Sequence, residues 1–254
     1  IENQSGVDDI DRILEVADGI MVARGDMGVE IPFIKLPEIQ KTLIRKTVVA
    51  GKYVITATQM LESMTNSPRP TRAEISDVAN AVYDGTSAVM LSGESAAGKY
   101  PVESVQALND ICCEAESNGE SIALQEYIKK YPITESFRET ICHAAKDVAE
   151  NINAKAIIVE SATGQVARAM AHYRPSCPII AVVTSERVCK KLCLNWGITA
   201  VIGEEKLTTD AITKQAMAKA LSTGYVKKGD TVLVLSSNKT VPTSGTDTLN
   251  IRII

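Results

Sequence analysis

The sequence predicts an α/β protein in which helices cover both faces of parallel sheets. Short apolar runs of strand length alternate with segments of helical periodicity along the 254 residues. Parallel strands need crossover connections, so this alternation favours a parallel arrangement. The runs are apolar throughout instead of alternating with polar residues, which indicates that both faces of each strand are buried.

The first part of the chain is expected to contain three strands, at residues 19–23, 53–57 and 87–91. Apolar residues three and four positions apart predict helices at residues 7–17, 36–48 and 71–82. The last of these begins with Thr71 and Glu74 at capping-box spacing, directly after Pro70. A fourth helix is expected to begin at Pro101, because proline is favoured in the first helical position.

A polar run with one glycine, at residues 117–121, suits a linker, and a new α/β cycle follows it. The cycle opens with a helix at residues 134–152, whose apolar face carries Phe137, Ile141, Ala145, Val148 and Ile152. Five further strands are expected at residues 156–159, 178–183, 200–202, 231–235 and 248–253. We therefore predict an open, doubly wound α/β domain at 118–254, after a first domain at 1–117.

Composition and charge argue against several classes of protein. The net charge is -4, aromatic residues make up 4%, and no basic stripe occurs, so no nucleic acid partner is expected. Without an apolar run of spanning length, no membrane association is expected either. The six cysteines form no C-x-x-C pair, which predicts reduced thiols and a cytoplasmic location. His143 and His172 have no nucleophile at suggestive spacing, so we expect no hydrolase triad.

Acidic and glycine residues follow the first expected strand, where ligands bind in parallel sheets. Asp26 lies in a loop with Gly25 and Gly28, and Glu2 ends what reads as an opening strand. Two carboxylates on adjacent strand ends suit Mg²⁺, which takes one or two protein carboxylates and completes its shell with other oxygens. The alternative is a plain turn that Asp26 only shapes.

Polar residues also follow the next two strands. Thr58 and Gln59 are expected to face the same cleft, where a hydroxyl can bind an anion or relay a proton. The alternative for Thr58 is a helix cap or a hydroxyl that is merely satisfied by hydrogen bonds. The loop Ser92-Gly93-Glu94 opens a helix, so its amides could meet a phosphate.

Several segments together resemble the pyruvate kinase family. The matching runs are DGIMVARGD at 18–26, ATQMLESM at 57–64, PRPTRAE at 68–74, SDVANAV at 76–82 and MLSGE at 90–94. The resemblance extends nearly without gaps from Ile1 to about residue 115. It continues more loosely through YRPSCPIIAV at 173–182 and KGDTV at 228–232.

The resemblance implies that residues 1–117 are the last three strands of a (β/α)8 TIM barrel plus the tip of the fifth strand. Because the chain opens with Ile1 and not with Met, we expect a piece of a longer polypeptide. Glu2 and Asp26 would be the protein ligands of Mg²⁺ or Mn²⁺, whereas K⁺ ligands are expected upstream. The backbone amides of Gly25 and Asp26 would hold the substrate carboxylate. Thr58 and Arg24 are the expected catalytic residues, with Thr58 beside the proton-delivery path.

The implied reaction is glycolytic: phosphoenolpyruvate and ADP become pyruvate and ATP, by phosphoryl transfer followed by enolate protonation. The family's phosphoryl-stabilising lysine and most of its nucleotide site would lie before Ile1, so this chain alone is expected to be inactive. The family is usually a homotetramer, and Arg72 is a candidate for a subunit face.

The resemblance further implies an allosteric sugar-phosphate site in the second domain. The matching loop holds Ser161, Thr163, Gly164 and Gln165, and the matching C-terminal turn holds Lys239, Ser244, Gly245 and Thr246. Gln165 and Val166 stand where an arginine and a serine are often found in the family. The missing cation weakens the case for fructose bisphosphate and leaves open another phosphorylated effector, or none.

Two other readings compete with a phosphotransferase. A noncatalytic phosphate-sensing α/β module would be favoured if the natural polypeptide begins near Ile1. A different phosphoenolpyruvate or aldol-type barrel enzyme could also place carboxylates and Mg²⁺ at strand ends. The nearly complete run of matches from Asp18 to Glu94 argues against this last alternative.

Overall fold

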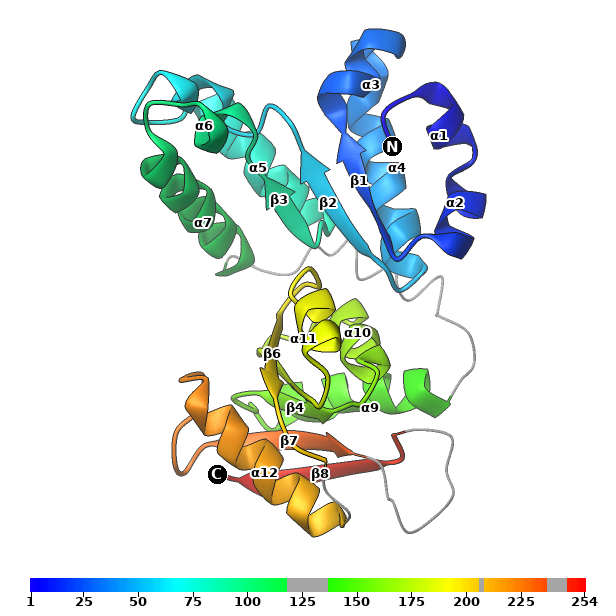
Figure 1. The fold of residues 1–254 in the computed structure, drawn as a ribbon, viewed down its shortest axis with the longest axis vertical. Coiled ribbons are helices and arrows are strands. Elements are labelled where there is room, and N and C mark those ends of the chain that lie inside the picture. Colours follow the sequence, from blue (N-terminus) through cyan, green and yellow to red (C-terminus); the bar gives the residue numbers. More distant parts are fainter. Residues whose placement is uncertain (118–136, 206–207, 237–245) are drawn as a thin grey trace. The chain divides into compact units, whose positions relative to one another are not determined.

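The computed structural model describes residues 1–117, 137–205, 208–236 and 246–254. The chain divides into two compact units, Ile1–Tyr131 and Pro132–Ile254, each with its own sheet (Figure 1). The division falls within residues 118–136, and the predicted boundary at 117/118 stays a prediction. None of the helices in the described ranges is long and apolar enough to cross a membrane.

A parallel sheet of three strands forms the centre of the first unit, in the order β1-β2-β3. Its strands are β1 (Gly19–Ala23), β2 (Tyr53–Ala57) and β3 (Ala88–Met90), which confirms the three predicted strands. The surrounding helices are α1 (Gln4–Asp8), α2 (Ile10–Val16), α3 (Arg24–Glu30), η1 (Phe33–Lys35), α4 (Leu36–Val49), η2 (Glu62–Thr65), α5 (Arg72–Asp84), α6 (Gly93–Ala96) and α7 (Pro101–Ser117). α4 packs against β1 and β2, and α5 packs against α7 (Figure 1).

The single helix predicted at residues 7–17 is wrong, because the chain forms two short helices there. Asn3 caps α1 by accepting a hydrogen bond from the Gly6 amide, and α1 ends at Asp8, with Asp9 as its C-cap. α2 then begins and buries Ile10 and Leu14. The backbone of Asp9, with φ -93° and ψ 12°, therefore separates two helices within an apolar pattern that reads as continuous.

Ile1 extends the first sheet beside β1. The Ile1 amine donates to the Met21 carbonyl at 2.7 Å, and the Ala23 amide donates to the Ile1 carbonyl at 3.1 Å. In a parallel pair of strands, the N–H and C=O of one residue bond to two residues of the neighbouring strand that are two positions apart. The two bonds of Ile1 follow this pattern. In this register Glu2 lies beside the carboxyl end of β1, where the sequence places the tip of another strand.

The second unit is built on a sheet of five strands in the order β6-β5-β4-β7-β8. The strands are β4 (Ile157–Glu160), β5 (Ile179–Val183), β6 (Ile198–Ile202), β7 (Thr231–Ser236) and β8 (Thr248–Ile253). β4 to β7 are parallel, and β8 is an antiparallel edge strand. The strand order reverses between β4 and β7, as in an open, doubly wound sheet.

Four helices of the second unit are described: α9 (Phe137–Asn151), α10 (Gln165–His172), α11 (Glu186–Leu192) and α12 (Thr209–Ser222). Ala216 and Ala220 of α12 pack on Ile158, Ile180 and Val234 of the sheet. The expected α9 face is partly wrong. Phe137 is 89% exposed, whereas the buried residues are Glu139, Cys142, Ala145 and Ala149. These are spaced three or four positions apart, so they form one face, which shares only Ala145 with the predicted one.

Candidate active site at the strand ends

The carboxyl ends of β1 and β2 meet side by side. Ala23 pairs with Ala57 at the end of the parallel ladder, so the next residues, Arg24 and Thr58, leave the sheet together. The Gly25 amide donates to Thr58 Oγ1 at 2.8 Å, and the Thr58 hydroxyl donates to the Ala57 carbonyl at 2.6 Å. The predicted convergence of these two segments is therefore present.

Thr58 and Gln59 both have left-handed backbones, with φ values of 70° and 54°. Such a conformation is unusual for any residue other than glycine and is an outlier for a β-branched one. Each costs on the order of 1–3 kcal/mol and persists only where its surroundings enforce it, typically at functional sites. No glycine marks this turn in the sequence, so the pattern analysis gave no sign of it.

The guanidinium of Arg24 donates hydrogen bonds to the backbone carbonyls of the strained turn. Nη2 donates to the Thr58 carbonyl at 2.6 Å, and Nε donates to the Ala57 carbonyl at 3.3 Å. On its other side Nη1 lies 2.7 Å from Asp77 of α5 and 3.3 Å from the Gln40 side-chain oxygen of α4. Arg24 thus joins two strand ends to two helices, and its predicted catalytic role stays a prediction.

Glu2 and Asp26, the predicted metal ligands, lie at the same edge of the sheet. Glu2 follows Ile1 in the ladder beside β1, and Asp26 lies in the first turn of α3, which begins directly after β1. Both side chains are exposed. Within the described ranges, no group of three or more histidine, cysteine or acidic side chains gathers as a metal site. Two carboxylates still suffice for Mg²⁺, because water and substrate oxygens complete its shell.

Glu94 is a buried acidic residue that the sequence did not identify as structural. Its side chain is 0% exposed and accepts hydrogen bonds from the Leu61 amide at 3.0 Å and the Ser92 amide at 2.8 Å. One carboxylate therefore ties the loop after β2 to the loop after β3. The Ser92 amide, which the sequence offered to a phosphate, is engaged by this carboxylate.

Glu74 holds the start of α5 against the same region. The predicted capping box is confirmed, because Thr71 Oγ1 accepts from the Glu74 amide and the Glu74 carboxylate accepts from the Thr71 amide. That carboxylate also accepts from Ser63, through its amide at 2.7 Å and its hydroxyl at 2.6 Å. Burial would raise the pKa of Glu74, but the hydrogen bonds from Ser63 and Thr71 outweigh it and lower the pKa.

The loop predicted to bind an effector follows β4 in the second unit. Ser161 Oγ accepts from the Gly164 amide at 3.0 Å, and Gly164 has a φ of +75° as the residue that caps α10. Thr163 Oγ1 lies 3.5 Å from the Gln165 amide. Lys239, Ser244 and Gly245 lie outside the described residues, whereas Thr246 is described and buried.

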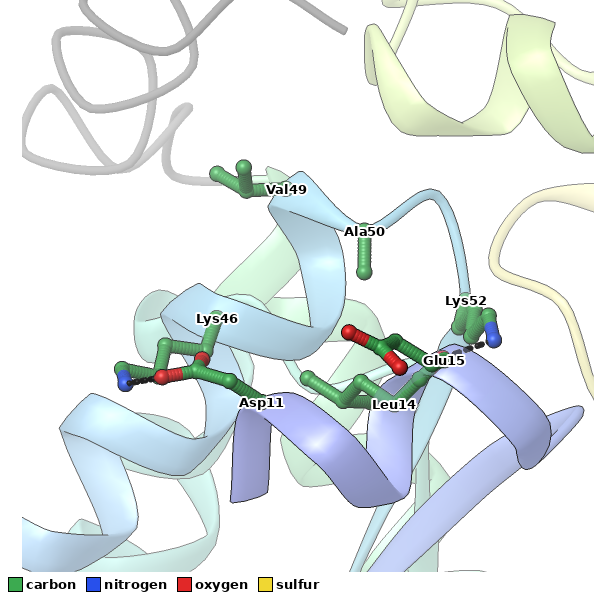
Figure 2. Close-up of a pocket in the computed structure, with 7 residues that line it drawn as sticks. All are labelled: Asp11, Leu14, Glu15, Lys46, Val49, Ala50 and Lys52. Atoms are coloured by element: carbon green, nitrogen blue, oxygen red, sulfur yellow. Dashed lines mark hydrogen bonds and ion pairs between the residues drawn. The ribbon is translucent and has the colours of Figure 1, made fainter. Parts of the chain in front are cut away.

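A surface pocket lies at the other end of the first sheet, where β1 and β2 begin (Figure 2). It is formed by α2, α4 and the residue before β2, and its cations are engaged. Lys46 pairs with Asp11 at 2.6 Å, and the Lys52 ammonium donates to the Leu14 carbonyl. This end of a parallel barrel normally serves stability instead of chemistry, so we do not assign the active site to it.

The histidines and cysteines show no catalytic pairing in the described ranges. The rings of His143 and His172 each pack edge-on against Tyr173, with centroid distances of 5.4 and 5.1 Å. All six cysteines are free thiols, as predicted. Burial raises the pKa of the Cys142 thiol to about 12, which makes it a poor nucleophile at neutral pH.

Comparison with known proteins assigns both units to one family. Residues 1–105 match the family model "Pyruvate kinase, barrel domain", and residues 139–252 match "Pyruvate kinase, alpha/beta domain". The chain is 48% identical to pyruvate kinases of Clostridium acetobutylicum and Staphylococcus epidermidis, with all of this chain aligned to 54% and 43% of those proteins. It thus spans about half the length of the curated relatives it matches.

A solved structure supports the same assignment. All of the chain superimposes on half of a pyruvate kinase from Cryptosporidium parvum, with a TM-score of 0.92 at 39% identity. These matches confirm the predicted fold class, which is the final part of a (β/α)8 barrel followed by an open α/β domain. The two domain models, the sequence relatives and the solved structure together show that this chain belongs to the pyruvate kinase family.

Proposed function

We propose that the natural polypeptide carrying this sequence transfers the phosphoryl group of phosphoenolpyruvate to ADP and releases pyruvate and ATP. The observation that carries the proposal is the hydrogen-bonded contact between the ends of β1 and β2. There the Gly25 amide donates to the hydroxyl of Thr58, whose backbone is left-handed, and the neighbouring Asp26 is exposed. The family membership of both units supports the same reaction.

In this proposal Glu2 and Asp26 hold Mg²⁺ or Mn²⁺. When bound there, the divalent ion would supply charge neutralisation, which phosphoryl transfer needs more than covalent help. Glu2 follows Ile1 beside β1, Asp26 lies in the first turn of α3, and both are exposed, so both are open to a hydrated ion. K⁺ ligands are expected in polypeptide outside this chain.

The backbone amides of Gly25 and Asp26 bind the substrate carboxylate at the start of α3. The Gly25 amide donates to Thr58 Oγ1 in this structure. A substrate carboxylate at this position therefore competes with the Thr58 hydroxyl for the amide, or shares it. Binding would in either case change the hydrogen bonds of Thr58, which couples substrate capture to the residue proposed for proton delivery.

The chemistry balances when one proton is taken up from solvent. The bond between phosphorus and the enol oxygen breaks, and a bond from phosphorus to a terminal β-phosphate oxygen of ADP forms. The resulting enolate takes one proton at its terminal carbon and becomes pyruvate. In this proposal Thr58 lies beside the path of that proton. Its hydroxyl, which donates to the Ala57 carbonyl here, would turn from that carbonyl to relay a proton and regain one from solvent.

Regulation by a phosphorylated effector is a further part of the proposal. Ser161, Thr163, Gly164 and Gln165 would bind its phosphate together with Thr246 and with Lys239, Ser244 and Gly245 from outside the described residues. Ser236, at the end of the neighbouring β7, has a fully buried hydroxyl without a hydrogen-bond partner in the described part of the chain. A polar ligand at these strand ends would satisfy that hydroxyl.

We also propose that the polypeptide is a cytoplasmic homotetramer with Arg72 at a subunit face, and that residues 1–254 alone are inactive.

The alternative function is a noncatalytic phosphate-sensing module. Its support in the structure comes from Ser236 and the Ser161 loop only. Steady-state formation of pyruvate from phosphoenolpyruvate and ADP, measured with the natural polypeptide and with residues 1–254 alone, tests these statements. Effector titration without any turnover in the natural polypeptide would favour the alternative.

A further inference from the structure

Arg24 is the centre of the polar contacts at the ends of β1 and β2. Its side chain is only 12% exposed. The guanidinium meets three successive carbonyls, of Ala57 at 3.3 Å, Thr58 at 2.6 Å and Gln59 at 3.4 Å. Successive carbonyls of an extended strand point in opposite directions, so they meet one cation only where the chain turns. The left-handed backbones of Thr58 and Gln59 provide that turn.

The remaining donors of the guanidinium face two helices. Nη1 donates to Asp77 Oδ1 at 2.8 Å and lies 2.7 Å from its Oδ2, and it also donates to Gln40 at 3.3 Å. Asp77 supplies the balancing charge that a largely buried cation needs. Arginine suits this place because its fork presents five donors in fixed directions.

The Gln40 side chain, which contacts the guanidinium from α4, is held in turn by α5. Gln40 is buried, and its amide nitrogen donates to Asp84 at the end of α5, 3.3 Å away. The Lys41 ammonium binds the other oxygen of Asp84. The guanidinium thus contacts α5 directly through Asp77 and indirectly through Gln40 and Asp84, and such a network resists rotation of any one member.

We propose that Arg24 is a positioning residue: it holds the Thr58–Gln59 turn, and with it the Thr58 hydroxyl, in the orientation that the reaction uses. Asp77 and Gln40 hold the guanidinium in turn. The kinetic consequences of this inference rest on the proposed function, whereas its structural consequences rest on the contacts alone. Arg24 acts through Thr58 and does not bind the substrate.

A substrate-binding arginine would behave differently. To reach a phosphate, the Arg24 guanidinium would have to leave the carbonyls of Thr58 and Ala57 and separate its charge from Asp77. Its replacement would then raise the KM for phosphoenolpyruvate. Loss of a positioning residue lowers kcat instead, because the substrate still binds while Thr58 is misplaced.

The test uses the natural polypeptide with Arg24→Met, Arg24→Lys and Asp77→Asn, and with Arg12→Met as the matched control. Arg12 is an exposed arginine on α2 that pairs with Asp9. We expect Arg24→Met to lower kcat about 100-fold with KM for phosphoenolpyruvate nearly unchanged, since a displacement of about 1 Å can cost that much. Asp77→Asn should give a smaller loss of kcat, and Arg12→Met none. A raised KM at unchanged kcat would overturn the inference.

A double-mutant comparison with Thr58 distinguishes a positioning role of Arg24 from a general effect of Arg24 on stability. If Arg24 acts through Thr58, adding Arg24→Lys to Thr58→Ala costs little beyond Thr58→Ala alone. If the two losses multiply, Arg24 acts independently and the inference is wrong. Arg24→Lys keeps the charge and Asp77→Asn keeps an acceptor, so the comparison survives if Arg24→Met does not fold.

A structural readout needs no catalysis. We expect crystals of the Arg24→Met or Arg24→Lys polypeptide to show Thr58 and Gln59 out of the left-handed region, with the bond from Gly25 to Thr58 lost. Retention of both φ values near 70° and 54° would overturn the inference. Absence of kinase activity in the unmodified polypeptide would instead sink the proposed function and leave this readout valid.

Discussion

The Gly25 amide donates a hydrogen bond of 2.8 Å to Thr58 Oγ1, which links the loop after β1 to the strained turn after β2. The ends of these two strands are therefore held by contacts with each other as well as by the bonds within the sheet. The Arg24 side chain and the Gly25 amide, both from the end of β1, hold the Thr58 backbone and hydroxyl. The segments that follow β1 and β2, which carry Asp26 and Thr58, are therefore joined through Arg24 and Gly25.

Thr58→Val should lower kcat for pyruvate formation by about 100-fold to 10,000-fold, the range of general acid–base contributions. Valine keeps the shape and branching of threonine but leaves the Gly25 amide without its acceptor. Thr58→Ser is the matched variant, since it keeps the hydroxyl, and it should retain most of the activity. Equal activity of the Val and Ser variants would contradict a role for the hydroxyl.

Glu94→Gln should destabilise the first unit by about 1–3 kcal/mol, because a buried donor loses its acceptor. The carboxylate accepts from the Leu61 and Ser92 amides, and the amide group of glutamine has only one accepting oxygen. Hydrogen exchange of the Leu61 and Ser92 amides measures the effect locally. Glu15→Gln on the exposed side of α2 serves as the control and should leave these rates unchanged.

Gly164→Ala should destabilise the second unit more than Gly197→Ala. Both glycines have left-handed backbones, so both variants carry a penalty of roughly 1–2 kcal/mol. At Gly164 a Cβ would also lie 3.0 Å from Val188 and 3.1 Å from Leu192, whereas at Gly197 it meets nothing within 4 Å. Urea unfolding followed by hydrogen exchange in β4 would show the difference, and equal losses would mean that α11 simply moves aside.

The start of α5 should lose stability in acid. The pKa of Glu74 is lowered in the folded protein, so its contribution is fully present above the unfolded value of 4.5 and is lost as pH falls through the folded pKa. Glu74→Gln should speed hydrogen exchange in the first turn of α5 at pH 7. The difference from the unmodified protein should shrink as the pH falls below 4.5. A difference that grows in acid would contradict the assigned hydrogen bonds.

Much of the fold was predictable because burial determines it. Strands such as β2 and β5 are apolar runs, and parallel pairing then brings the residues that follow them to one edge. Proximity of Gly25, Asp26 and Thr58 follows from that alone. The capping box at Thr71 and Glu74 was predictable as well, since it is local in sequence.

The details of the site were not predictable from pattern. A threonine with positive φ contradicts its own backbone preference and is held by Arg24, a residue 34 positions away. The burial of Glu94 depends on two amides from different loops, and a carboxylate after a strand otherwise suggests exposure. Both features arise from tertiary contacts that override local propensity.

The most direct test of the account is the initial rate of pyruvate formation from phosphoenolpyruvate and ADP, as a function of Mg²⁺, in the natural polypeptide with Asp26→Ala. Asp11→Ala, which removes a surface partner of Lys46, is the control. We predict that Asp26→Ala abolishes turnover at all Mg²⁺ concentrations, while Asp11→Ala behaves as the unmodified protein. Turnover of the Asp26→Ala polypeptide at the unmodified rate would contradict the proposed metal site and the function built on it.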